Sequence, residues 1–155
     1  MKTIILYATK YGSCADIAQR IAGKIDGSVT HNLKEAVPSL EEFDCIILGS
    51  PVYAGSIRKE AKRFLLHSAD ILLKKKNGLF LCGMDTDSKD AFFSANFSPE
   101  ILEKTAAKDF LGGVYDPKKA NFFERFIMKL ITKQSGCISA INDGKIEKFA
   151  EEMKA

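Results

Sequence analysis

The chain has 155 residues, of which 46% are hydrophobic and 28% are charged, and its formal net charge is +3 at pH 7. These values are typical of one globular domain that is large enough to bury a core, so we expect a single domain over residues 1–155. The chain contains neither an uncharged apolar run of about 18 residues nor a dense basic run with interleaved aromatic residues, so we expect no membrane-spanning helix and no nucleic-acid partner.

Short apolar runs alternate with segments of helical periodicity along the chain. The predicted strands are Thr3–Ala8, a weaker Ser28–Asn32, Cys45–Gly49, Leu79–Gly83 and Phe110–Tyr115. The predicted helices are Ser13–Ile25, Ile57–Leu73 (ended by a turn at Lys76-Asn77-Gly78), one that begins at Ser98-Pro99, and a last one from an N-cap at Asp143, with Ile146, Phe149, Ala150 and Met153 on its inner face. This alternation predicts an α/β fold with a parallel sheet covered on both faces, in which ligands bind at the carboxyl ends of the strands.

The first of these strand ends is followed by the loop Thr9–Cys14, which leads directly into a helix. Unpaired N–H groups at a helix start favour a phosphate, and Thr9 and Ser13 add hydroxyl donors. The loop has no Lys-Ser or Lys-Thr pair of a P-loop and no second glycine beside Gly12, so a phosphate monoester fits better than a nucleoside triphosphate or a dinucleotide. The alternative is that Ser13 is an ordinary helix N-cap with nothing bound.

Two further loops are expected at the same edge of the sheet. The segment Gly49–Ile57 places Tyr53 where it can stack on a flat ring, and the alternative is a tyrosine packed against the neighbouring loop. The segment Gly83–Ser88 offers backbone groups to the edge of a heteroaromatic ring, and the alternative is a solvated turn. The three loops together are more specific than any one of them.

These loops make the chain resemble the flavodoxin family. Thr9, Tyr11, Gly12 and Ser13 match the family's phosphate loop, whereas Cys14 stands where threonine is usual. The segments Gly49–Gly55 and Gly83–Asp85 resemble the two flavin loops, although the second lacks the usual aromatic residue unless Phe92 or Phe93 reaches the ring. The resemblance implies a three-layer sandwich with a five-stranded parallel sheet of order 2-1-3-4-5. It also implies non-covalent FMN held by Thr9, Lys10, Tyr11, Gly12, Ser13, Cys14, Ser50, Pro51, Val52, Tyr53, Ala54, Gly55, Gly83, Met84 and Asp85.

The resemblance to the family also suggests the chemistry of the site. FMN would exchange electrons or a hydride at its exposed dimethylbenzene edge and N5, and backbone groups near Gly55 are expected to bond N5 because a glycine peptide flips readily. Asp85 is expected near the ring. No general acid–base set and no metal site are expected, and His31 and His67 are expected at the surface.

A second resemblance narrows the family. The segments Tyr115–Lys118 and Asn121–Gly136, with Tyr53–Ser56, look like the corresponding parts of the flavodoxin-like, menaquinone-dependent protoporphyrinogen oxidases. That branch implies an FMN-dependent oxidoreductase that passes electrons from a porphyrinogen to a quinone at the membrane. The alternative is a flavodoxin-type electron shuttle that docks to a redox partner protein and has no substrate of its own.

An inserted amphipathic helix is expected at about residues 118–136. Its apolar stripe is Phe122, Phe123, Phe126, Ile127, Leu130 and Ile131, and its basic flank is Lys118, Lys119, Arg125, Lys129 and Lys133. One possibility is that the helix packs on the core with a solvated basic face. The other is a lid beside the flavin whose basic face meets an anionic membrane, porphyrin carboxylates or an acidic redox partner.

The four cysteines, Cys14, Cys45, Cys82 and Cys137, lie far apart and form neither a CxxC pair nor a zinc spacing. We therefore expect buried free thiols in a reducing compartment. The first residues, Met1-Lys2-Thr3, run into a strand without a secretory signal pattern, so the expected location is cytoplasmic, with a possible peripheral position at the inner face of the membrane.

Overall fold

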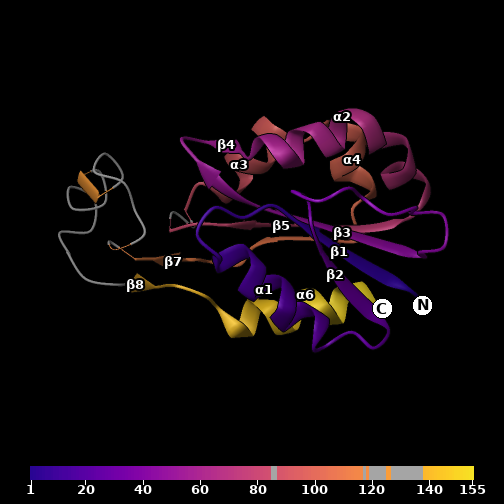
Figure 1. The fold of residues 1–155 in the computed structure, drawn as a ribbon, viewed down its shortest axis with the longest axis horizontal. Helices are drawn as coiled ribbons and strands as arrows, with labels where there is room; N and C mark the ends of the chain where they lie inside the picture. Colours follow the sequence, from indigo (N-terminus) through magenta and orange to yellow (C-terminus); the bar gives the residue numbers. More distant parts are fainter. Residues whose placement is uncertain (85–86, 117, 119–124, 127–137) are drawn as a thin grey trace.

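A parallel sheet lies between two layers of helices in the computed structural model, which describes residues 1–84, 87–116, 118, 125–126 and 138–155 (Figure 1). The parallel strands are β1 (Thr3–Tyr7), β2 (Ser28–Asn32), β3 (Cys45–Tyr53), β5 (Lys76–Cys82) and β6 (Ala107–Phe110). Their order is β2-β1-β3-β5-β6, which confirms the expected α/β fold and strand order. The short β4 (Ser56–Ile57) pairs antiparallel with the end of β3, and β7 (Val114–Tyr115) pairs with β8 (Ile138–Ser139).

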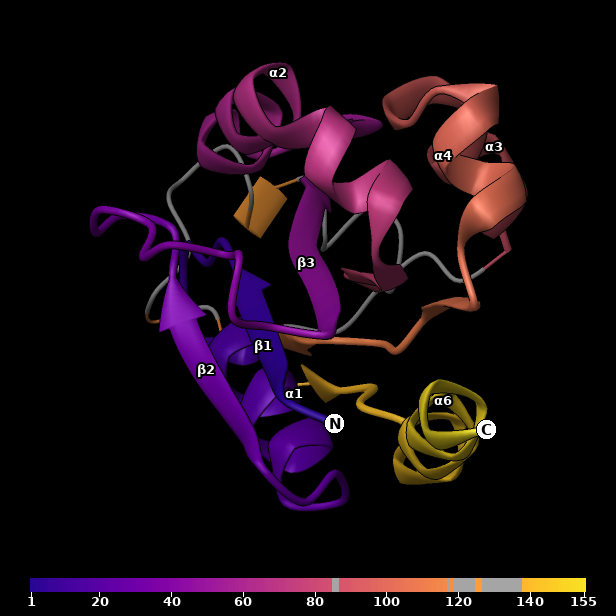
Figure 2. The ribbon, with the colours of Figure 1, turned by 90° about the vertical axis from the view of Figure 1, so that its right-hand side faces the viewer.

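The helices cover both faces of the sheet. Helices α1 (Ser13–Ala22) and α6 (Asp143–Lys154) lie on one face, and α2 (Lys59–Lys74), α3 (Lys89–Asn96) and α4 (Pro99–Lys104) lie on the other (Figures 1 and 2). Alternate residues of a strand point to opposite faces, so β1 contributes to two cores. Leu6 packs in the cluster under α2 and α4 with Phe64 and Ile101. Ile5 packs in the cluster under α1 and α6 with Ile17 and Phe149.

The fifth predicted strand, Phe110–Tyr115, is wrong in its bounds. Strand β6 ends at Phe110, because Gly112 has φ +87 and turns the chain away. A Cβ at Gly112 would lie 1.9 Å from the carbonyl oxygen of Ala140, so only glycine lets the two segments approach this closely. Val114 and Tyr115 then pair with β8 instead of with the parallel sheet.

The predicted turn at Lys76-Asn77-Gly78 is also wrong, because these residues begin β5. Asn77 is fully buried, its Nδ2 donates to the carbonyl oxygen of Leu72 at 2.9 Å, and its Oδ1 accepts from Thr105 Oγ1 at 3.0 Å. Gly78 makes room for Met153, whose sulfur would lie 2.5 Å from an added Cβ. The Asn77-Gly78 pair therefore lies in a buried strand, where it packs against α6 and hydrogen-bonds to neighbouring segments, and does not form a turn.

The predicted helices hold with shifted ends. Helix α1 ends at Ala22, and α2 begins at Lys59 because the backbone of Ile57 belongs to β4. Helix α6 is capped by Asn142, whose side chain accepts from the N–H of Lys145, one residue before the predicted cap. Helix α3 was not predicted.

Candidate functional site

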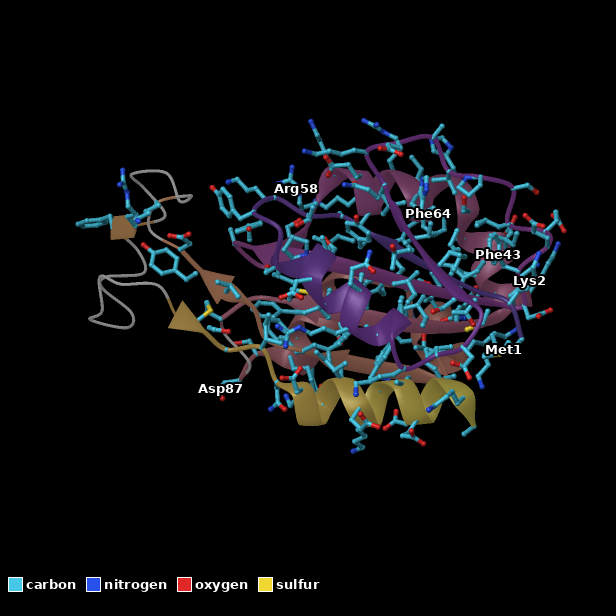
Figure 3. All side chains as sticks on the ribbon, turned by 60° about the horizontal axis from the view of Figure 1, so that its bottom comes forward. Met1, Lys2, Phe43, Arg58, Phe64 and Asp87 are labelled. Carbon is cyan, nitrogen blue, oxygen red and sulfur yellow. The ribbon has the colours of Figure 1, made fainter. Side chains whose placement is uncertain are left out.

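Three loops meet at the carboxyl ends of β1, β3 and β5, and we call Thr9–Cys14, Pro51–Ile57 and Gly83-Met84 together the three-loop rim. The rings of Tyr11 and Tyr53 are 6.4 Å apart at an interplanar angle of 88°. Pro51 pairs with Cys82 in the sheet, and a Cβ added on Gly83 would lie 3.8 Å from the carbonyl oxygen of Val52, so the third loop begins beside the second. In Figure 3, Asp87 lies toward the end of the molecule opposite Met1 and Lys2. The three loops that were predicted to form the site therefore lie together at the carboxyl edge of the sheet.

The first loop leaves the start of α1 open. Gly12 is the N-cap of α1, with φ +98, and no side chain caps this helix among the described residues, so the idea that Ser13 is the cap is wrong. Thr9 Oγ1 accepts from the N–H of Gly12 at 3.0 Å, which shapes the loop and leaves the hydroxyl hydrogen available. A Cβ added at Gly12 would meet no atom within 4 Å. Open space in front of uncapped helix N–H groups fits a phosphate.

A lysine lies over the two tyrosines of the rim. Lys10 Nζ is 4.9 Å from the ring centroid of Tyr11 and 5.1 Å from that of Tyr53, within the range of a cation–π interaction. Tyr53 remains 36% exposed. The contact joins the first loop to the second and places a positive charge beside an accessible aromatic ring.

The second loop is more regular than the sequence suggested. Pro51 and Val52 belong to β3, which continues to Tyr53 and turns back into β4 through Ala54 (φ 51) and Gly55 (φ 77). Positive φ at both central residues is the geometry of a tight two-residue hairpin turn. This turn sets the direction of the Gly55 peptide at the rim.

The hydroxyl of Ser50 holds this hairpin from within the fold. Ser50 is 2% exposed, its Oγ donates to the carbonyl oxygen of Pro51 at 2.9 Å, and it accepts from the N–H of Arg58 at 3.0 Å. The side chain of Ser50, a predicted cofactor residue, therefore positions the loop.

Asn96, at the end of α3, clamps the hairpin and was missed by sequence reasoning. Its Nδ2 donates to the carbonyl oxygens of Gly55 at 3.0 Å and Phe92 at 2.8 Å, and its Oδ1 accepts from the N–H of Ile57 at 3.1 Å. These partners on the hairpin lie 41 and 39 residues away in the chain, so no local pattern could have identified the residue.

Cys14 contributes only backbone atoms to the three-loop rim, because its side chain points into the core. Its side chain is 0% exposed, and its Sγ lies 2.9 Å from Cys82 Sγ at the end of β5. Burial, followed by the hydrogen bond to Cys82, raises the pKa of the Cys14 thiol well above its ordinary value. The side chain that replaces the family's threonine therefore points into the core, and only the Cys14 N–H remains for a phosphate.

The third loop begins directly after β5 and is hydrogen-bonded to the segment that follows β6. The N–H of Gly83 donates to the carbonyl oxygen of Gly112 at 3.0 Å, and Met84 is half-buried. Asp85 lies outside the described residues. Phe92 packs on Phe110 at 6.0 Å, and Phe93 packs on Phe97 at 5.9 Å, so both rings belong to the core under α2 and α4.

The predicted helix at about 118–136 lies outside the described residues, apart from Lys118, Arg125 and Phe126. Phe126 is 55% exposed. Both alternatives for this segment, a core helix and a lid, therefore stay predictions. The expected contact with a membrane stays a prediction as well. No helix within the described ranges is both long and apolar enough to span a membrane.

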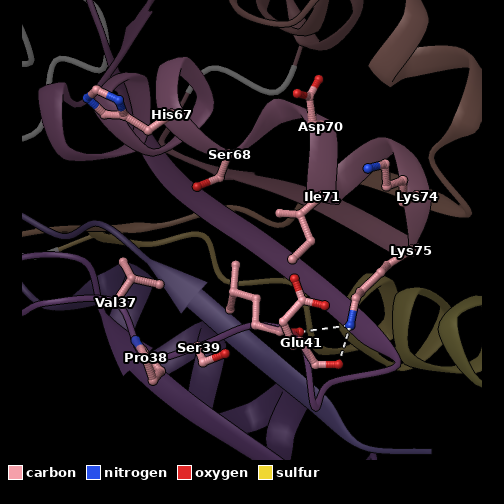
Figure 4. Close-up of a pocket in the computed structure, with 11 residues that line it drawn as sticks. Val37, Pro38, Ser39, Glu41, His67, Ser68, Asp70, Ile71, Lys74 and Lys75 are labelled. Carbon is pink, nitrogen blue, oxygen red and sulfur yellow. Dashed lines mark hydrogen bonds between the residues drawn. The ribbon is translucent and has the colours of Figure 1, made fainter.

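A separate cavity of about 550 Å³ lies between residues 37–41 and the second half of α2, including His67 and Asp70 (Figure 4). Lys75 Nζ donates to the carbonyl oxygens of Leu40 and Glu41, each at 2.8 Å, on one side of it. This cavity adjoins the segments that lead into the amino ends of β3 and β5. It is therefore distinct from the three-loop rim.

Comparisons with known proteins agree with this geometry. A family model described as Flavodoxin domain matches residues 4–138, which include the whole rim. The protoporphyrinogen IX dehydrogenase (quinone) of Escherichia coli K12 is 25% identical over 162 residues, covering 88% of this chain and 81% of that protein. Fusobacterium nucleatum flavodoxin bound to flavin mononucleotide is similar in structure, with a TM-score of 0.57 and 21% identity over 99% of this chain and 98% of that one. Rubredoxin oxygen:oxidoreductase of Desulfovibrio gigas has a TM-score of 0.63 and 12% identity, and this chain covers only 35% of it.

Proposed function

Because the chain belongs to the flavodoxin domain family, we propose that it is a redox protein whose three-loop rim holds its FMN cofactor and which acts as an oxidoreductase linked to a quinone. FMN is the cofactor, and it supplies the electron or hydride transfer chemistry. The protein's own part is to bind the phosphate, flank the ring and limit access to it.

The start of α1 carries this proposal. Its N–H groups at Ser13 and Cys14, the hydroxyl of Thr9 and the open space beside Gly12 form a cradle that suits a phosphate monoester. Within the described part of the rim, Tyr11 and Tyr53 are the aromatic side chains that would flank the ring, and the Ala54-Gly55 turn supplies backbone groups. Lys10 adds positive charge on the same side.

A matched pair of glycine variants tests the phosphate site. Gly12 and Gly27 both have positive φ, and Gly27 lies in the turn between α1 and β2, away from the rim. Each change to alanine should lower the free energy of unfolding by about 1 kcal/mol, because alanine is strained there. Gly12→Ala should in addition weaken FMN binding by roughly 10- to 100-fold, because the methyl group enters the cradle.

Quenching of FMN fluorescence during titration of the apoprotein measures the affinity, and urea unfolding measures the stability. Equal FMN affinities of Gly12→Ala and Gly27→Ala would place the phosphate elsewhere. A wild-type protein that takes up no FMN would contradict the whole proposal.

The quinone-linked activity rests on the similarity to the protoporphyrinogen IX dehydrogenase, which extends over 88% of this chain. The FMN-loaded protein should oxidise protoporphyrinogen IX when a quinone is the acceptor, at a rate above that of free FMN. Absence of turnover, together with rapid electron exchange with a reductase, would instead support the alternative of an electron shuttle.

A further inference from the structure

Two buried cysteines from different elements face each other beneath the rim. Cys14 is the second residue of α1, Cys82 is the last residue of β5, and both are 0% exposed. Their Sγ atoms lie 2.9 Å apart, although the residues are separated by 68 positions in the chain. The fold therefore brings together two sulfur atoms that the sequence spacing gave no reason to pair.

The contact is within reach of a covalent bond. A disulfide has a sulfur–sulfur distance of about 2.05 Å, so a shift of less than about 1 Å would join the two atoms. Such a bond would fasten the first turn of α1, behind the phosphate cradle, to the point where the third loop leaves β5.

We propose that Cys14 and Cys82 form a reversible dithiol–disulfide couple that is oxidised by a hydroperoxide. One thiolate attacks a peroxide oxygen, the O–O bond breaks, and a sulfenic acid and water result after proton transfer. The second thiolate then attacks the sulfenic sulfur, the S–S bond forms and the S–O bond breaks, which releases a second water. The balance is two thiols and one hydrogen peroxide to one disulfide and two waters.

The surroundings of the pair determine when this happens. In the closed fold both sulfurs are shielded from solvent, and desolvation raises the pKa of Cys14, which keeps this thiol in its neutral form. Oxidation thus proceeds through brief local openings of the rim. Cys45 on β3 is equally buried. Its oxidation by peroxide can therefore be compared with that of the pair, to separate the effect of burial from the effect of a neighbouring thiol.

Peptide mapping of the purified full chain tests the couple. Trypsin places the four cysteines in separate peptides, with Cys14 in residues 11–20 and Cys82 in residues 77–89. The reduced protein is treated with hydrogen peroxide, free thiols are alkylated after unfolding, and the non-reduced digest is analysed by mass spectrometry. We expect peptide 11–20 joined to peptide 77–89, and separation of the two after treatment with dithiothreitol.

Variants identify the partners. Cys14→Ser and Cys82→Ser should each abolish the linked peptide, whereas Cys45→Ser should retain it. The wild-type map is decisive even if one variant folds poorly. Linkage of Cys14 or Cys82 mainly to Cys45 or Cys137 would overturn the proposal. The proposal would also be overturned if Cys14 and Cys82 were both fully alkylated, and therefore still reduced, after a peroxide treatment that is strong enough to oxidise glutathione in a parallel sample.

Discussion

Cys45 shows how one buried residue couples stability to pH. Desolvation on β3 raises the pKa of its thiol to about 11, compared with an ordinary value of 9.0. The unfolded chain therefore loses this proton at a lower pH than the folded protein does. The contribution to stability is complete below pH 9.0 and is lost as the pH rises to about 11.

The expected loss of unfolding free energy from this residue is about 1–3 kcal/mol over that interval. Urea unfolding in the presence of a reductant, on both sides of the interval, measures it. The comparison is with Cys45→Ala, which removes this thiol alone and whose stability should fall less steeply with pH. Identical slopes for the two proteins would show that Cys45 does not titrate in this way.

Individual residues also show which parts of the site can be predicted from the sequence. Thr9 and Gly12 could be assigned to a phosphate loop, because a strand, a short polar loop and a helix follow one another locally. Asn96 could not be assigned, because its hairpin partners are distant in the chain. The orientation of the Cys14 side chain was equally out of reach, since it depends on Cys82 from another element.

Helix α3 and the β3–β4 hairpin are held together by Asn96, and this contact predicts an effect on the site. In Asn96→Asp a carboxylate oxygen faces the carbonyl oxygen of Gly55, so the donor is lost and two acceptors repel each other. We expect a loss of about 1–3 kcal/mol in unfolding free energy and weaker FMN binding, because the hairpin carries Tyr53.

Asn32→Asp is the matched control. The Oδ1 of Asn32 accepts from the N–H of Lys34 at 2.9 Å, a role that a carboxylate oxygen can keep. Thermal unfolding and FMN titration of both variants separate the clamp from a general effect of added negative charge. If Asn96→Asp binds FMN as tightly as Asn32→Asp, the clamp does not contribute to the site.

At the scale of elements, apolar periodicity located the strands that are buried on both faces. The predicted strand bounds were wrong where a glycine or an asparagine packs against residues that are distant in the chain. Gly112 ends β6 because Ala140 packs against its backbone, and Asn77-Gly78 begins β5 because Leu72, Thr105 and Met153 surround it. Local turn propensity gave the opposite prediction at Asn77-Gly78, and tertiary packing overrode it.

For the molecule as a whole, periodicity alone indicated a parallel α/β sheet, and the resemblance to a family supplied the order of its strands. That order brings β1, β3 and β5 side by side, so their loops share one edge. It also brings α1 against the end of β5 and places Cys14 on Cys82. The same topology that assembles the rim thus creates the cysteine pair.

The oxidised pair should therefore change the stability of the entire fold. A bond between Cys14 and Cys82 closes a loop with a sequence separation of 68 residues, which reduces the conformational freedom of the unfolded chain. Chain-entropy arguments give an increase of about 4 kcal/mol in unfolding free energy, and strain in the folded state would lower it. Urea unfolding of the oxidised and reduced protein should show a higher midpoint for the oxidised form. The double variant Cys14→Ala/Cys82→Ala, treated with the same oxidant, should show no such rise. An unchanged midpoint in a protein whose peptide map contains the linked pair would mean that strain in the folded state cancels the gain.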